Sequence, residues 1–133
     1  MAHQTVEEAV EARLRDNWTN CAVFTENMET LVPSDGTSFL MLQFPVSDAE
    51  RLGITNRLYR ETGAFRIVIA IEAGSGPAKM REWGEELRDL FIDRVFDGVT
   101  TQVPSDPLTD DRSDRGPYFV GYMAVPYTFN FTA

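Results

Sequence analysis

The stretch that decides the fold is LYRETGAFRIVIAIEAGSGPAKMREWGEELRDLF, residues 58–91. From Phe65 onward apolar side chains alternate with others, and many are β-branched, so this period of two predicts a strand over 58–72. A Gly-Ser-Gly-Pro turn follows. Pro77 suits a first helical turn because its missing N–H costs nothing there, and the apolar stripe beyond it predicts a helix over 75–91. That stripe consists of Met80, Trp83, Leu87, Leu90 and Phe91.

Two glycines in this stretch carry structural meaning. Gly63 precedes the alternating run, where a bulge or bend in the strand is expected. Gly84 interrupts the helical stripe and would let a neighbouring segment approach the helix closely. The stripe itself fits either a groove for a partner or a hydrophobic core. We expect core, because a sheet needs a helix on one face.

Further elements are predicted on both sides of this stretch. Thr5 and Glu8 have capping-box spacing and precede apolar residues at helical intervals, which predicts a helix over 5–18. Apolar runs predict the remaining strands, at 21–24, 38–46, 99–103 and 118–131. Pro45 cannot donate to a ladder, so it marks the end or the edge of its strand. Residues 47–56 are polar and fit either an irregular strand or one helical turn.

Two segments predict loops, residues 27–38 and the charged stretch PSDPLTDDRSDRGP at 104–117. A loop as long as the second is usually functional or disordered. The 133 residues fit a single domain, 1–133. The order helix, strands, helix, strands predicts an α+β fold: a largely antiparallel sheet of four to five strands with two helices packed on one face.

The charge balance narrows the choice of partners. The chain carries 21 acidic residues against 12 basic ones, a net charge of −9, which argues against gripping nucleic-acid phosphates or an anionic membrane. It remains compatible with DNA passing nearby without sticking. No apolar run approaches the roughly 20 residues that cross a bilayer, and the N-terminus lacks the pattern of a signal peptide. Cys21, the single cysteine, fits a reducing cytoplasm.

The sequence offers little for catalysis or for binding a metal. His3 is the only histidine and is expected in a disordered terminus, so a catalytic triad and a zinc site are both disfavoured. The Gly-Ser-Gly-Pro turn lacks the spacing of a phosphate-binding loop. The aspartates of the 104–117 loop lack the spacing of a calcium site and fit a solvated loop. We therefore expect no enzyme activity, no cofactor and no metal.

Some residues are candidates for contacts between subunits. Arg51, Arg57 and Arg60 form a basic cluster, which fits either a solvated face or a contact for an acidic patch such as Asp110 and Asp111 on a neighbouring copy. The last predicted strand is apolar on both faces, with tyrosines at 118 and 122 on one of them. It therefore covers something on each side, either a helix plus another sheet or a second subunit, which makes Tyr118 and Tyr122 candidate interface residues.

Taken in order, these segments resemble the tail terminator, or tail-completion, proteins of long-tailed bacteriophages and gene transfer agents. The likeness lies in Arg-Asp-Asn-Trp at the end of the first helix, the strand AVF before Thr-Glu-Asn, and the strand FLMLQF. It continues through ETGAFRIVIAIEAGSG, a helix ending in LRDLF, and a long aromatic final strand. The resemblance spans about residues 6–131 and contains no catalytic motif.

The resemblance implies a structural role in a particle tail, assembled in the host cytoplasm. Such proteins form a hexameric ring on the head-proximal end of the tail tube, stop its polymerisation, and offer a surface to head-completion or stopper proteins. DNA passes through the lumen without specific binding. The alternatives are a head–tail connector or stopper subunit, and a small-ligand-binding α+β domain. Charge reversal at Arg57 and Arg60 would test their share in ring contacts.

Overall fold

The computed structural model describes residues 3–25, 38–54, 57–72, 74, 76–109, 114–115 and 118–132. The elements within these ranges are α1 (Gln4–Asn17), β1 (Ala22–Thr25), β2 (Phe39–Arg51), β3 (Leu58–Glu72), α2 (Gly76–Phe91), β4 (Val95–Phe96), β5 (Val99–Thr101), β6 (Asp114–Arg115) and β7 (Tyr118–Thr132). Both predicted helices and the strand over 58–72 are confirmed.

The strands form one sheet in the order β1-β2-β3-β7-β5-β4, with β6 also paired to β7. The α+β class and the largely antiparallel sheet are confirmed, but the predicted number of four to five strands was too low. The described residues give a seven-stranded mixed sheet, in which β1 runs parallel to β2. Strands β4 and β6 are two residues long, too short to leave a sequence period, and a single strand's pattern does not record the direction of its neighbour.

Strand β2 is longer than the predicted 38–46, because it continues through Pro45 to Arg51. The pairing with β3 shifts between Gln43 and Val46, and this bulge removes Pro45 from the ladder without ending the strand. Gly63 of β3 lies opposite Ser47, and a Cβ at this glycine would collide with the carbonyl oxygen of Val46. The bulge expected at Gly63 is therefore not in β3: the irregularity lies in the facing strand between Gln43 and Val46, and Gly63 admits the close approach of Val46.

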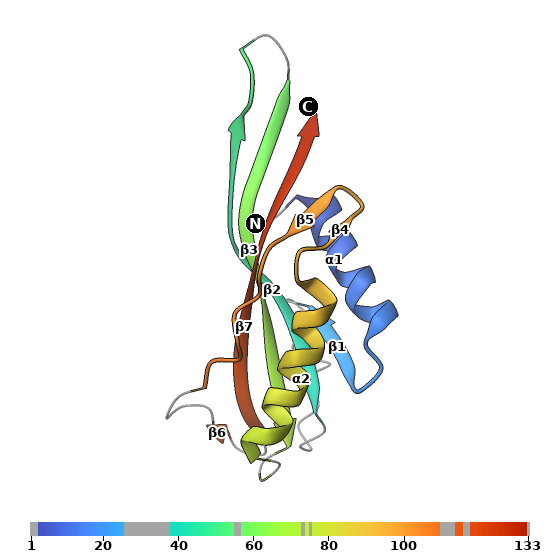
Figure 1. The fold of residues 1–133 in the computed structure, drawn as a ribbon, viewed down its shortest axis with the longest axis vertical. Coiled ribbons are helices and arrows are strands. Elements are labelled where there is room, and N and C mark those ends of the chain that lie inside the picture. The colour runs from blue at the N-terminus through green and yellow to red at the C-terminus, as the bar shows by residue number, and fades with distance from the viewer. Residues whose placement is uncertain are drawn as a thin grey trace.

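Both helices cover the same face of the sheet, as predicted (Figure 1). Trp18 at the end of α1 meets Trp83 of α2 edge to face, with 5.3 Å between ring centroids. Arg13 of α1 donates from Nε to the carbonyl oxygen of Leu90 in α2, at 3.0 Å. The apolar stripe of α2 is core, as expected. Its Met80, Trp83, Leu87 and Phe91 pack with the odd-numbered apolar residues of β3 and β7.

A second, smaller apolar cluster lies on the other face of the sheet. It contains Phe39, Ala70, Tyr118 and Val120, all less than 10% exposed. Phe39 meets the rings of Phe24 and Tyr118 edge to face, at centroid distances of 5.8 and 5.2 Å. This cluster explains why β7 is apolar on both sides over its first half.

Part of the predicted 104–117 loop is ordered along β7. The backbone N–H groups of Ser105 and Leu108 donate to the carbonyl oxygens of Ala124 and Tyr122, at 2.9 and 2.8 Å. Pro107 lies over Gly84 of α2, where a Cβ would come within 2.8 Å of the proline Cδ. The expectation that Gly84 admits a close neighbour is confirmed. We call residues 102–109 the strap, since they join β5 to the region of α2.

The N-terminus is fixed more firmly than the sequence predicts. His3 is the N-cap of α1, and its ring accepts a hydrogen bond from the N–H of Thr5, so the predicted cap at Thr5 was two residues late. The backbone N–H of His3 donates to the Glu61 carboxylate, at 3.0 Å to Oε1. Tyr127, fully buried, donates its hydroxyl to Oε2 of the same carboxylate at 2.7 Å. Expecting His3 in a disordered terminus was wrong, because a distant carboxylate holds it.

The β2–β3 hairpin extends beyond the helices, together with the end of β7 (Figure 1). Strand β2 pairs with β3 as far as Arg51 opposite Tyr59, so residues 47–51 continue the sheet and the alternative of a helical turn was wrong for them. Residues 55–56 of this predicted segment lie outside the described residues. The described part of the hairpin end contains Leu52 and Ile54, which are 38% and 94% exposed. In Figure 1 no helix lies over this projecting part of the hairpin, and most of residues 47–54 are exposed.

Replacing Gly84 with alanine tests the close contact between α2 and the strap. We expect a net loss of about 1–3 kcal/mol in the free energy of unfolding, because overpacking against the Pro107 ring outweighs the helical preference for alanine. In a Pro107→Ala background the same change becomes neutral or stabilises by about 0.5–1 kcal/mol. Urea unfolding of the four proteins measures this cycle. Equal effects in both backgrounds would show that Pro107 is not the obstacle.

The buried hydroxyl of Tyr127 makes stability depend on pH. Burial and the hydrogen bond to Glu61 raise the pKa of Tyr127, so folding favours the neutral phenol. Its contribution is complete below the ordinary tyrosine pKa of about 10 and is lost as the pH rises above it. We expect Tyr127→Phe to cost about 1–3 kcal/mol near neutral pH, and its deficit to shrink at about pH 11. The control is Tyr59→Phe, a half-buried ring stacked on Phe131. Denaturant unfolding at the two pH values measures the stability deficit of each variant. Equal deficits for both variants at both pH values would contradict the role given to the Tyr127 hydroxyl.

Candidate assembly surfaces

The predicted arginine cluster lies on the projecting hairpin but does not share one face of it. Arg51 is paired opposite Tyr59 and Arg60 opposite Glu50, and neighbouring pairs in a ladder point to opposite faces. Arg51 donates to the carbonyl oxygen of Ile54 at 3.2 Å, next to the hairpin end. Arg60 donates to the Asn130 side chain of β7 at 3.2 Å.

Arg57 precedes β3 and is exposed, so the hairpin carries positive charge on both faces and near its end. The prediction grouped the three arginines because they lie close together along the chain. A strand separates such neighbours by turning alternate side chains to opposite sides.

The other predicted interface residues fall in different surroundings. Asp110 and Asp111 lie outside the described residues. Tyr118 is buried in the second apolar cluster, where it packs against Phe39. Tyr122 is half-buried beneath the guanidinium of Arg66, whose Cζ lies 5.4 Å from the ring centroid. Arg66 is oriented there by a 2.6 Å hydrogen bond from its Nε to Gln43. The first half of β7 thus serves internal packing.

A groove between α2 and the strap was not predicted from the sequence. Its volume is about 480 Å³. Met80, Gly84, Pro107 and Phe119 supply its apolar lining, and Thr109 lies beside them. Three of its charged residues, Arg81, Glu85 and Arg88, come from α2 and the fourth, Asp106, from the strap. The signal available in the sequence was Gly84 in a helix, which permits the strap to lie close.

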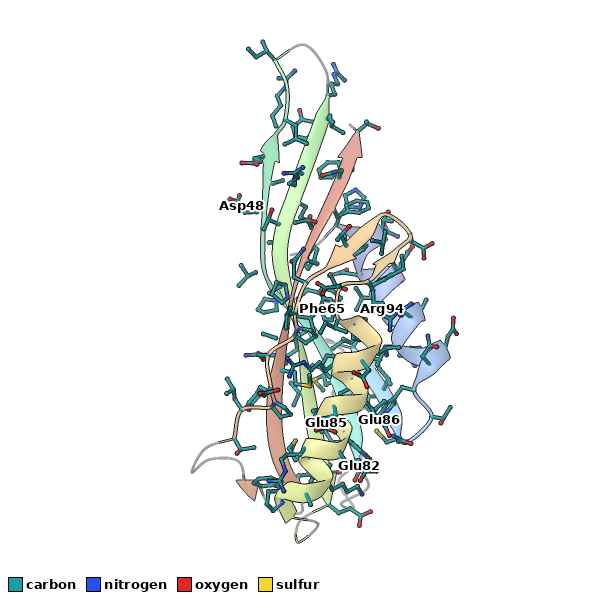
Figure 2. All side chains as sticks on the ribbon, in the orientation of Figure 1. Asp48, Phe65, Glu82, Glu85, Glu86 and Arg94 are labelled. Carbon is teal, nitrogen blue, oxygen red and sulfur yellow. The ribbon has the colours of Figure 1, made fainter. Side chains whose placement is uncertain are left out.

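The charges around this groove are partly paired. Arg88 donates from Nη1 to Asp106 at 2.9 Å, across the gap between α2 and the strap. Both side chains are well exposed, so this ion pair contributes little to stability but orients the two groups. Glu82, Glu85 and Glu86 follow one another along α2 (Figure 2), and Asp89 extends the series. The exposed side of α2 as a whole therefore carries more negative than positive charge, whereas the charges that line the groove itself, two arginines and two carboxylates, balance.

A smaller cavity of about 200 Å³ lies at the other side of α2, next to Cys21, Lys79 and Trp83. The indole N–H of Trp18 donates to the sulfur of Cys21 at 3.3 Å. Burial raises the pKa of the Cys21 thiol, which opposes formation of the reactive thiolate. This cysteine is therefore a packing residue at the edge of the main core.

Within the described ranges, no three His, Cys, Asp or Glu side chains gather in a way that could hold a metal ion. His3 and Glu61 do approach each other, but through the backbone N–H of the histidine. None of the helices in this part of the chain combines the length and the apolar character needed to cross a bilayer. The surfaces on offer are the projecting hairpin and the groove, and both suit contacts with another protein.

Comparisons with known proteins bear on the fold and on the family of this chain. Among solved structures, one matches with a TM-score of 0.53 and 19% identity, over 98% of this chain and 94% of that chain. A likeness at this identity concerns the fold alone. No curated protein matches the sequence significantly. The family model of the phage tail terminator protein matches residues 5–127, which is nearly the whole chain. The chain therefore belongs to the phage tail terminator family, and it is a structural protein of a phage tail.

Proposed function

We propose that this protein forms a hexameric ring on the head-proximal end of a tail tube, where it ends polymerisation of the tube and offers the surface that joins the head. The match of the tail terminator family over residues 5–127 carries this proposal. Because the match includes every helix and nearly every strand, the function belongs to the fold as a whole.

The architecture supports a ring in a physical way. A ring needs two different surfaces on each copy, one of which meets the other on the next copy. The projecting hairpin and the groove beside α2 are such a pair, since one protrudes and the other is hollow. The rigid sheet between them fixes their relative positions. A closed ring also has a fixed number of copies, because every hairpin and every groove in it is occupied by a neighbouring copy.

The proposed partners follow from this position. One rim of the ring binds the last ring of tail tube protein, and the other binds a head-completion or stopper protein. DNA crosses the lumen without specific contacts, which suits a chain with a net charge of −9. The protein joins the particle in the host cytoplasm and stays in its tail. None of these roles requires a chemical step.

Deleting the gene from the phage-like particle that encodes it tests the proposal. We expect tails of variable and excessive length that fail to join heads, because nothing then stops the tube or links it to the head. Electron microscopy of the particles measures tail length, and the intact gene supplied in trans is the control. Tails of normal length joined to heads would contradict the proposal.

A further inference from the structure

The end of the β2–β3 hairpin carries exposed apolar side chains that do not stabilise the fold of a single chain. Ile54 is 94% exposed, and Leu52, two residues before it, is 38% exposed. They follow a polar stretch of β2 and stand at the end of the part of the hairpin that reaches beyond the helices (Figure 1). Ile54 therefore contributes almost nothing to the core of its own chain, and burying it elsewhere would be favourable.

The groove between α2 and the strap suits an aliphatic side chain such as that of Ile54. Its volume of about 480 Å³ lies within the range of about 300–1,000 Å³ in which pockets bury a ligand. Met80, Pro107 and Phe119 give it apolar walls, and the Pro107 ring lies against Gly84 of the helix. An aliphatic side chain that enters the groove would leave water and pack against these apolar side chains.

We propose that the hairpin end of one copy, with Leu52 and Ile54, docks into the groove between α2 and the strap of the next copy. The occupant belongs to a second copy, because the hairpin end points away from its own α2 along the long axis of the molecule (Figure 1). This inference rests on the proposed ring and names the contact that would build it. The contact is head to tail, since the two surfaces differ.

Charge favours this pairing of surfaces. Arg51 and Arg57 flank the hairpin end, while Glu85 borders the groove and Glu82 and Asp89 lie next to it on α2. Two arginines also line the groove: Arg88 is paired with Asp106, and Arg81 adds a positive charge beside Glu85. The arriving hairpin therefore brings positive charge to a helix whose exposed side is mostly acidic. Complementary charge of this kind mainly fixes the orientation and speeds the encounter, while the apolar side chains supply the affinity.

Disulfide trapping in assembled tails tests the contact. The chain carries Ile54→Cys and Glu85→Cys in a Cys21→Ser background, and isolated tails are oxidised and separated on a non-reducing gel. We expect a ladder of covalent oligomers that ends at the closed ring, because each copy offers one hairpin end and one groove. Each single-cysteine variant is a control and should give no ladder.

The outcomes separate this inference from the proposed function. Tails of normal length whose protein stays uncrosslinked would overturn the docking contact and leave the ring standing. A pattern that stops at dimers would also overturn it, since that result means reciprocal pairing of two copies. If deleting the gene leaves tails normal, the ring proposal fails first and this contact fails with it.

A second variant keeps the test independent of cysteine chemistry. Ile54→Asp places a charge in the proposed contact but should leave the unfolding midpoint unchanged, because the side chain is exposed in the single chain. We expect it to lower the yield of correctly terminated tails about tenfold or more, as for a residue at the centre of an interface. Val95→Asp, at a side chain 74% exposed in β4, is the matched control and should have little effect. Normal termination by the Ile54 variant would show that the groove receives a different occupant.

Discussion

The pairing of β3 with β7 is the constraint on which the other elements depend. Each strand is 15 residues long, and they pair without a shift from Leu58 opposite Thr132 to Glu72 opposite Tyr118. Because side chains alternate along a strand, a slip of one residue would exchange the two faces of the whole ladder. The observed register places Ile67 and Met123 side by side beneath the helices and Val68 beside Tyr122 on the other face. The helices can cover one face only while this register holds.

The polar contacts mark where the helical cover ends. Glu61 and Tyr127 lie on the helix side of the ladder, and their hydrogen bond, with that of His3, fixes the start of α1 to the sheet. Thr101 plays a similar part for α2, because its buried hydroxyl donates to the carbonyl oxygen of Phe91 and accepts from the N–H of Arg94 at 3.2 Å. Each contact satisfies groups that burial would otherwise leave unpaired. Beyond Glu61 the sheet continues as the projecting hairpin, where packing on the helices no longer decides which residue types occur.

The sequence predicted the elements that a repeating pattern controls. Both helices and the strand over 58–72 follow from their periods, and the two-sided apolar character of the last strand follows from its composition. It did not predict the reach of β2 past Pro45, because a bulge absorbs a proline that would otherwise end a strand. The anchoring of His3 escaped prediction for another reason, since its partner Glu61 lies 58 residues away and resembles any surface glutamate. Of the predicted interface residues, the arginines lie on the surface, whereas Tyr118 is packed inside.

The groove and the hairpin end escaped prediction because neither is a property of one segment. The groove exists because Pro107 of the strap can approach Gly84 of α2, and the hairpin end matters because it reaches past the helices that cover the rest of the sheet. Local patterns report what a chain does for its own core. An isoleucine that is 94% exposed contributes to no core, so its role is to be sought in contacts with a second molecule. A subunit that must recognise its own copies needs such residues outside its core. The surfaces that its core leaves unexplained are therefore the place to look for its assembly contacts.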